Sequence, residues 1–376
     1  MKTLLLVAGS RSGSDFFQSL LDGNSQVLQF PGLIKTNKTL IRILLSDNAN
    51  DICSNFIKNY PHFFDSRLGY GKVERHDALG ENKNQYYLVD QEKFKINFIK
   101  MFEKKCKINK HNKIFELILM LHQAYALTCG QNISKKKIMI INCHIVKWTK
   151  YFGKKIDNVD FDIIHTIRNP LSAVSSPVNH WLNYDAGKSF FAKSIYFQLD
   201  LIVNGIKKLK KLNKRIFLVQ LEMLHKRHFH VMDDFCKTYN LNYENSMQYA
   251  TFFNLQFWGD KISGQYLTGV NKNFKISFNE ETFYKRDIKF LEYILNDYIK
   301  FYGYQFTGVT SKIFFNLIPM KCEILTWKNS FKHKRIKHIL SIPFFYIKRL
   351  LYINKFSQKD LKMPHSFGTE LKNNIN

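Results

Sequence analysis

The stretch LLLVAGSRSGSDFFQSLLDG, residues 4–23, decides the fold class of this chain. It begins with an apolar run, continues through a short loop of glycine and serine with one arginine, and ends in a segment with helical spacing. The apolar run predicts a buried strand over residues 2–8, and the spacing of Phe16, Leu20 and Leu21 predicts a helix over 15–21. The chain therefore begins with a strand, a loop and a helix.

The same alternation continues along the chain, apart from residues 34–110, which we expect to be polar and irregular. Strands are predicted over 138–142, 161–167 and 215–221, and helices over 113–128, 190–212, 229–239 and 283–302. Strands separated by helices form a parallel sheet that is covered on both faces. We therefore expect an α/β fold.

The composition predicts a large core and anionic partners. The chain has 376 residues, of which 45% are hydrophobic, and its 57 Lys and Arg against 30 Asp and Glu give a formal charge of +27. This charge favours a nucleotide, a nucleic acid, an acidic glycan or a lipid surface as partner. Solvated surface lysine explains the charge equally well, and we expect no specific nucleic acid.

We expect a cytoplasmic protein with reduced cysteines. The apolar core of residues 4–8 is shorter than that of a signal peptide, and polar residues follow it at once. The apolar stretch 338–353 is interrupted by Lys348 and Arg349, which disfavours a membrane span. The six cysteines have no metal-ligand spacing, so no structural metal is expected.

The loop at residues 9–14 is expected at the carboxyl edge of the sheet, where proteins of this class bind ligands. Backbone N–H groups, small residues and the positive end of the following helix favour a phosphate there. Arg11 supplies a charge partner. The loop lacks the lysine of the G-x-x-x-x-G-K-[ST] pattern, which disfavours an ATPase or a GTPase.

A second strand, loop and helix are predicted in DIIHTIRNPLSAVSSPVNHW, residues 162–181. Arg168, at the strand end, can form two hydrogen bonds to a phosphate, and Ser176 can donate its hydroxyl to the same group. Alternatively, Asn169 and Pro170 only begin a helix and Arg168 pairs with an acid, since proline is common at the first helical position.

Together, these two segments resemble the sulfotransferases that use 3′-phosphoadenosine-5′-phosphosulfate (PAPS). Residues 10–32 are similar to the 5′-phosphosulfate loop of that family, and IRNPLSAVSS (167–176) is similar to its 3′-phosphate segment. The resemblance extends over roughly residues 1–305. It implies a P-loop-kinase-like domain, with a central parallel sheet flanked by helices, that transfers a sulfuryl group from PAPS to a hydroxyl and releases adenosine 3′,5′-bisphosphate.

The resemblance also implies which residues bind PAPS. They are Arg11, Ser12, Gly13, Ser14, Phe16, Arg168, Ser176, Thr251, Phe253 and Lys272. In this set, Arg11 takes the place of the catalytic Lys or Arg, and residues 12–14 contact the 5′-phosphate. Arg168 and Ser176 contact the 3′-phosphate, and the aromatic residues lie near the adenine. The family also has a basic segment further along its sequence, of which this chain has no clear copy. Lys272 is the residue expected to make the contact in its place.

A base must remove the proton of the acceptor hydroxyl, and we expect His144 in that role. His144 ends the strand in KIMIINCHIV (137–146), and family members with a histidine base carry it in a K-x-H element at this place; here Asn142 replaces the lysine. Other branches use a glutamate after the first helix, but FPGLIK (30–35) holds no acid. Alternatively, His144 is only hydrogen-bonded at the sheet edge.

Two other features leave alternatives open. Asp15 stands where the family has Ser or Thr, and its carboxylate either repels the phosphate or points away from it in the first helical turn. The polar residues of segment 74–77, namely Glu74, Arg75, His76 and Asp77, either shape an acceptor pocket or belong to a surface loop.

We expect a sulfotransferase-like catalytic domain over residues 1–310 and a basic, aromatic-rich helical extension over 311–376. The extension either contacts an anionic membrane at the inner face or packs back onto the catalytic domain. The expected acceptor is a carbohydrate or a lipid-linked glycan. Two other functions stay open: a P-loop kinase-like phosphotransferase that binds ATP with magnesium, and a non-catalytic basic module that binds anionic membranes or nucleic acid.

Overall fold

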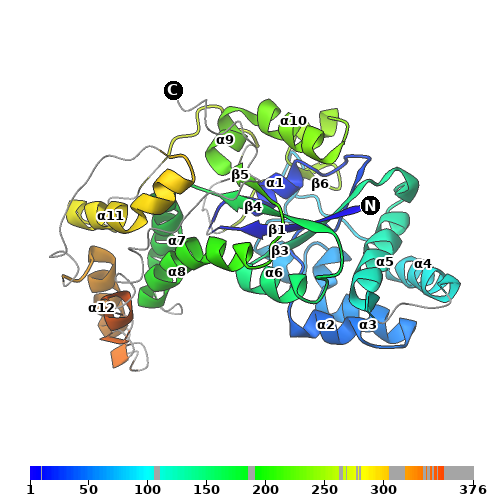
Figure 1. Ribbon diagram of the computed structural model, residues 1–376, viewed down its shortest axis with the longest axis horizontal. Coiled ribbons are helices and arrows are strands. Elements are labelled where there is room, and N and C mark those ends of the chain that lie inside the picture. Colours follow the sequence, from blue (N-terminus) through cyan, green and yellow to red (C-terminus); the bar gives the residue numbers. More distant parts are fainter. Residues whose placement is uncertain are drawn as a thin grey trace. The chain divides into compact units, whose positions relative to one another are not determined.

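The fold is a five-stranded sheet with helices around it (Figure 1). The computed structural model describes residues 1–9, 11–105, 111–184, 191–261, 266–267, 269–276, 278, 281–304, 318–332, 336, 339–340, 343–344 and 346–350. The strands are β1 Lys2–Ala8, β2 Val27–Gln29, β3 Ile138–His144, β4 Phe161–Ile167 and β5 Ile216–Gln220, in the order β2-β3-β1-β4-β5. β1 pairs in parallel with β3 and β4, and β2 with β3. The predicted α/β class with a parallel sheet flanked by helices is confirmed.

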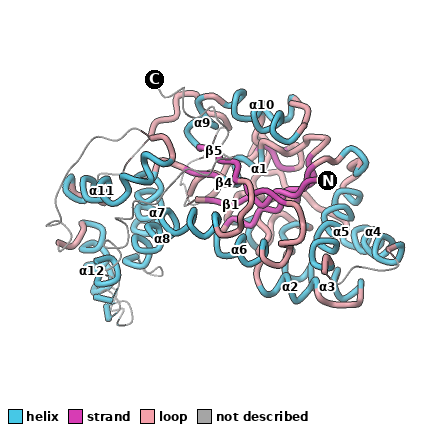
Figure 2. The backbone as a smooth tube through the Cα atoms, in the orientation of Figure 1, coloured by secondary structure: helices cyan, strands magenta, loops and turns pink. Residues whose placement is uncertain are grey.

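Helices make up most of the remaining described chain, as Figure 2 shows. They are α1 Ser14–Ser19, α2 Lys38–Leu44, α3 Ala49–Asn59, α4 Gln91–Lys104, α5 Lys113–Thr128, α6 Val146–Gly153, α7 Pro170–Tyr184, α8 Phe191–Lys210, α9 Leu221–Lys226, α10 His228–Tyr239, α11 Lys285–Phe301 and α12 Lys321–Lys332. A small antiparallel hairpin joins β6 Thr251–Phe252 to β7 Leu255–Gln256. The expectation that residues 34–110 are irregular is wrong, because α2, α3 and α4 lie there.

The chain divides into two compact units, which we describe separately. Unit 1 comprises Met1–Ala8, Gly13–Thr166 and Lys211–Phe274, and unit 2 comprises Gly9–Ser12, Ile167–Lys210 and Lys275–Asn376. Unit 1 holds nearly all of the sheet with α1–α6, α9 and α10, and unit 2 holds α7, α8, α11 and α12. The boundary between residues 310 and 311 remains a prediction.

In unit 1 the side chains of the central strand face alternately to the two sides of the sheet. Leu4 and Leu6 of β1 belong to a buried cluster with Phe17 of α1 and Phe235 of α10. Leu5, which points to the opposite face, is also fully buried. Because both faces are covered, the strand reads as a continuous apolar run, which made it recognisable in the sequence.

A second buried cluster in unit 1 is aromatic and includes a histidine. His122 of α5 is 2% exposed, and its ring centroid lies 4.3 Å from that of Phe30. Its Nδ1–H donates to the carbonyl of Ile118 at 2.7 Å, while Nε2 has no hydrogen-bond partner within the described chain. Burial lowers the pKa of His122 to about 4.

Replacing His122 with asparagine is expected to make stability less dependent on pH. The unfolded histidine binds a proton below pH ~6.5 and the folded one only below the lowered pKa, so stability falls as pH falls between these values. The variant lacks the contribution of His122, so the slope of the unfolding free energy against pH decreases by about 1.4 kcal/mol per pH unit. Urea unfolding from pH 7 to 4.5 measures it. His230→Asn, at an exposed position, should leave the slope unchanged, and an unaltered slope in His122→Asn would contradict the assignment.

In unit 2 the described end of the basic extension packs against α11 and α12. Arg349 is 1% exposed, and its Nε and Nη2 donate to the Glu323 carboxylate of α12 at 2.6 and 3.0 Å. Its guanidinium lies 5.7 Å from the ring centroid of Phe290 of α11. The described part thus agrees with packing back onto the preceding helices. In the described regions, no helix combines the length and apolarity needed to span a bilayer.

Candidate functional site

The loop after β1 forms a tight turn. Arg11 and Gly13 both have left-handed backbones, with φ of 46° and 76°, and the hydroxyl of Ser12 donates to the carbonyl of Gly9. A Cβ atom at Gly13 would lie 2.6 Å from Cδ1 of Leu221, so the position requires glycine for both reasons. Turns of this kind gather backbone N–H groups into a concave surface that suits an anion.

His144 ends β3 at an irregularity in the sheet. The register of β1 against β3 shifts between Leu6 and Val7, so that Val7 pairs with His144. His144 has a φ of 56°, in the left-handed region that side-chain-bearing residues rarely adopt. A bulge of this type redirects a side chain, and such a backbone costs ~1–3 kcal/mol. The strain falls on the residue that the sequence predicts to be the base.

A hydrogen bond joins His144 to the loop. Oγ of Ser14, the first residue of α1, lies 3.0 Å from Nδ1 of His144. Ser14 is buried and His144 is half-buried, and Nε2 of His144 has no hydrogen-bond partner among the described residues. The structure therefore brings two predicted site residues together.

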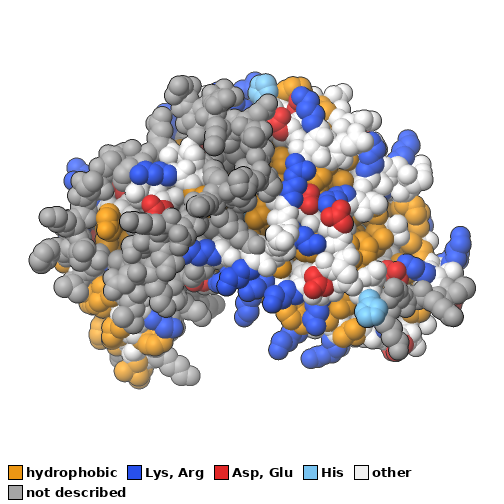
Figure 3. Space-filling view, in the orientation of Figure 1, with side chains coloured by type: hydrophobic (Ala, Val, Ile, Leu, Met, Phe, Trp, Pro, Cys, Tyr) orange, Lys and Arg blue, Asp and Glu red, His pale blue; other side chains and the backbone are white. Residues whose placement is uncertain are grey.

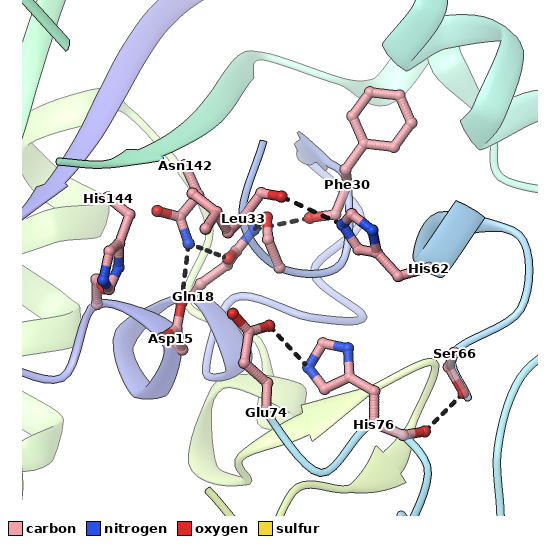
Figure 4. Close-up of polar contacts among 12 residues, drawn as sticks. Asp15, Gln18, Phe30, Leu33, His62, Ser66, Glu74, His76, Asn142 and His144 are labelled. Carbon is pink, nitrogen blue, oxygen red and sulfur yellow. Dashed lines mark hydrogen bonds and ion pairs between the residues drawn. The ribbon is translucent and has the colours of Figure 1, made fainter. Parts of the chain in front are cut away.

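Asn142 of β3 ties α1 to the same strand (Figure 4). Its Nδ2 donates to Oδ1 of Asp15 at 3.0 Å and to Oε1 of Gln18 at 2.7 Å. Gln18 in turn donates to the carbonyl of Phe30, which fixes its amide orientation. The Asp15 carboxylate is thus engaged by the amide that replaces the lysine of the K-x-H element. Sequence reasoning missed Gln18, although it lies one helical turn after Ser14.

The polar residues of segment 74–77 lie largely inside unit 1. Glu74, Arg75 and His76 are 7%, 6% and 0% exposed, so the surface-loop alternative is wrong for these three. Oε2 of Glu74 lies 3.8 Å from Nε2 of His76 (Figure 4), and neither atom has a hydrogen-bond partner among the residues that the structure describes.

The pKa shifts of this pair have the same cause. Burial, followed by the charges of Asp15 and Asp260, raises the pKa of Glu74 well above its usual value. Burial lowers the pKa of His76 to about 3. Both shifts favour the uncharged forms, so we interpret the contact as one between neutral groups and not as a salt bridge.

In unit 2, Arg168 directly follows β4 and Ser176 lies on α7; both are half-buried. The side chain of Asn169 accepts hydrogen bonds from the backbone N–H groups of Leu171 and Ser172 at 3.1 and 3.3 Å. Asn169 therefore caps α7, and Pro170 takes its first position, so the prediction that these two residues begin a helix is confirmed.

The two predicted phosphate-binding segments begin at neighbouring strand ends. β1 and β4 pair in register as far as Ala8 and Thr166. Arg11 and Ser12, from the first segment, belong to unit 2 together with Arg168 and Ser176. The fold thus brings these four predicted ligands into one compact unit.

Phe16, predicted near the adenine, lies in the core of unit 1. It is 4% exposed, and its ring stacks on His225 with centroids 4.7 Å apart. His225 stacks in turn on Phe274 at 4.5 Å and accepts a hydrogen bond from the backbone N–H of Asn271. Lys272 is exposed in the adjoining turn.

Thr251 and Phe253 have protein partners near the β6–β7 hairpin. The Thr251 hydroxyl donates to Asp22 at 3.0 Å, and the Phe253 ring stacks on Tyr87 at 4.2 Å. The roles of these residues and of Phe16 and Lys272 toward PAPS remain predictions. Within the described ranges, no group of three or more His, Cys, Asp or Glu could hold a metal ion.

Comparison with known proteins finds similarity only at the level of solved structures. No protein-family model matches the chain, and a search of curated proteins finds no significant match. A sulfotransferase from Mycobacterium avium aligns with a TM-score of 0.40 at 12% identity, over 82% of this chain and 78% of that chain.

Two further sulfotransferase domains align in the same way. The domain of the Synechococcus olefin synthase has a TM-score of 0.37 at 14% identity, over 73% of this chain and 84% of its own. The domain of the curacin biosynthetic pathway has a TM-score of 0.37 at 12% identity, over 88% of this chain and 97% of its own. The function proposed below is therefore based on the loops and side chains described above.

Proposed function

We propose that the chain transfers a sulfuryl group from PAPS to a hydroxyl of a carbohydrate or lipid-linked glycan. The contact between Ser14 and His144 carries the proposal, because it links the loop assigned to the 5′-phosphate with the residue assigned as base. The neighbouring ends of β1 and β4, each followed by an arginine-bearing loop, give further support, because parallel α/β sheets bind ligands at such ends.

In the proposed reaction the acceptor oxygen attacks sulfur in line with the bridging oxygen of PAPS. The hydroxyl proton passes to Nε2 of His144 as the new O–S bond forms. The electrons of the broken S–O bond stay on the bridging oxygen, where Arg11 stabilises the charge. Arg168 and Ser176 hold the 3′-phosphate, and His144 later returns its proton to solvent.

The surface charge is consistent with anionic substrates. Figure 3 shows Lys and Arg side chains at several places on the described surface in view. Such a field raises the rate at which anionic substrates arrive. We further propose a cytoplasmic enzyme whose extension, although Arg349 packs it against α11 and α12, also presents exposed apolar residues such as Phe331 and Leu340 to the membrane that carries the acceptor.

Calorimetric titration at moderate salt tests the donor. Adenosine 3′,5′-bisphosphate should bind about 100-fold or more tightly than adenosine 5′-phosphate, because the 3′-phosphate adds charge-assisted hydrogen bonds worth ~3 kcal/mol in total. Preferential binding of ATP with magnesium would instead indicate a phosphotransferase. Equal, weak and salt-sensitive binding of all three would indicate a basic module without a PAPS site.

A further inference from the structure

We propose that Ser14 is a positioning residue that makes His144 competent as a base only when an anionic donor occupies the loop. The inference rests on the proposed function, because it requires a phosphate oxygen at Ser14. Its basis is the 3.0 Å contact between Oγ of Ser14 and Nδ1 of His144, at a serine that is 2% exposed.

The contact has two forms that differ in the position of one proton. A neutral imidazole carries a proton on one ring nitrogen and a lone pair on the other, and a hydroxyl has a single proton to donate. If Ser14 donates to Nδ1, then Nε2 carries the ring proton and has no lone pair with which to accept the proton of the acceptor hydroxyl. If Nδ1–H donates to Ser14, then Nε2 presents its lone pair to the acceptor hydroxyl. Only the second form is an effective base.

An anion at the loop selects the second form. Within the described chain, His144 is the only hydrogen-bond partner of the Ser14 hydroxyl, so without a ligand Ser14 is free to donate to Nδ1. Phosphate and sulfate oxygens that carry no proton can only accept hydrogen bonds. Once Ser14 donates to such an oxygen, its lone pair remains for His144, and Nδ1 must then be the donor.

The surrounding contacts keep the two side chains in place while the proton changes position. Asn142, two residues before His144, holds Asp15 and Gln18 of α1 at 3.0 and 2.7 Å. The bulge at the end of β3 fixes the backbone of His144. Ser14 and His144 therefore stay within hydrogen-bond distance, and donor binding shifts the tautomer without moving the chain.

The test is nitrogen NMR of the full-length protein labelled with ¹⁵N-histidine, with and without saturating adenosine 3′,5′-bisphosphate. A His144→Gln spectrum assigns the resonances. In the wild type the ligand should raise the ratio of the Nδ1–H to the Nε2–H tautomer by about tenfold or more, the factor that one charge-assisted hydrogen bond provides. Ser14→Ala, titrated with the ligand to saturation, should not show this shift, and Ser14→Thr should restore it.

Ser19→Ala is the matched control, because the Ser19 hydroxyl, on the same helix, bonds to the carbonyl of Phe16 and not to the histidine, so the shift should persist. If calorimetry shows tight binding of the bisphosphate but the wild-type tautomer ratio does not change, the role of Ser14 is refuted while the proposed function stands. If the bisphosphate does not bind, both are refuted. The wild type and Ser14→Thr keep the test decisive if Ser14→Ala fails to fold.

Discussion

Replacing Arg168 with alanine is expected to weaken the binding of adenosine 3′,5′-bisphosphate by about 100-fold, a loss of ~3 kcal/mol. Removing one partner of a charged, hydrogen-bonded contact costs ~2–5 kcal/mol. Arg168 stands between the last residue of β4 and the capped start of α7, and the Asn169 cap uses the Asn169 side chain, which the substitution leaves intact. The effect should therefore be local and measurable by calorimetry at constant salt.

Two controls separate a 3′-phosphate contact from a general loss of positive charge. Adenosine 5′-phosphate, which lacks the 3′-phosphate, should bind the wild type and Arg168→Ala equally. Arg67→Ala removes a partly exposed arginine that pairs with Asp65, and it should leave the binding of both ligands unchanged. If Arg168→Ala lost the same affinity for both nucleotides, or if Arg67→Ala lost as much affinity as Arg168→Ala, the bisphosphate would respond only to the overall positive charge of the protein and not to a contact with Arg168.

The sequence was most informative where burial is complete on both sides of the sheet. The bounds predicted for β1, β4 and α5 agree with the structure, because long apolar runs have few alternative conformations. Residues 34–110 were misread because α2 and α4 mix charged and apolar residues, and their apolar faces are recognised only against the aromatic core they enclose. The first turns of α2, α3 and α4 are capped by the side chains of Asn37, Asn48 and Asp90. These capping residues are signals of helix starts that the prediction for residues 34–110 did not use.

In the candidate site, sequence motifs identified residues but not their pairings. The bond between Asn142 and Asp15 joins positions 127 residues apart, and a single sequence holds no information about which distant side chains meet. Asn142 and Asp15 each depart from the pattern of the sulfotransferases that the sequence resembles, and they are hydrogen-bond partners. The burial of Glu74 and His76 was equally unpredictable, because a short polar segment without periodicity gives no indication of which side faces inward.

Replacing His144 with alanine is expected to lower the rate of sulfuryl transfer by ~10²–10⁴-fold, the range for removal of a general base. Binding of adenosine 3′,5′-bisphosphate should remain within about threefold of the wild type, because Nε2 acts on the acceptor and not on the nucleotide. The measurement is transfer of ³⁵S from PAPS to a panel of neutral oligosaccharides and glycolipids. His230→Ala, which truncates an exposed histidine on α10, should be fully active.

The pattern of rates and affinities distinguishes the roles that His144 can have. A low rate with intact nucleotide binding, partly restored by added imidazole, is the result for a lost base. A parallel loss of binding and rate would show that His144 supports the loop through Ser14. Full activity in His144→Ala would exclude it as the base. Glu74 would then be a candidate to test as Glu74→Gln, because it is a buried carboxyl with a raised pKa whose charge interacts with that of Asp15 on α1.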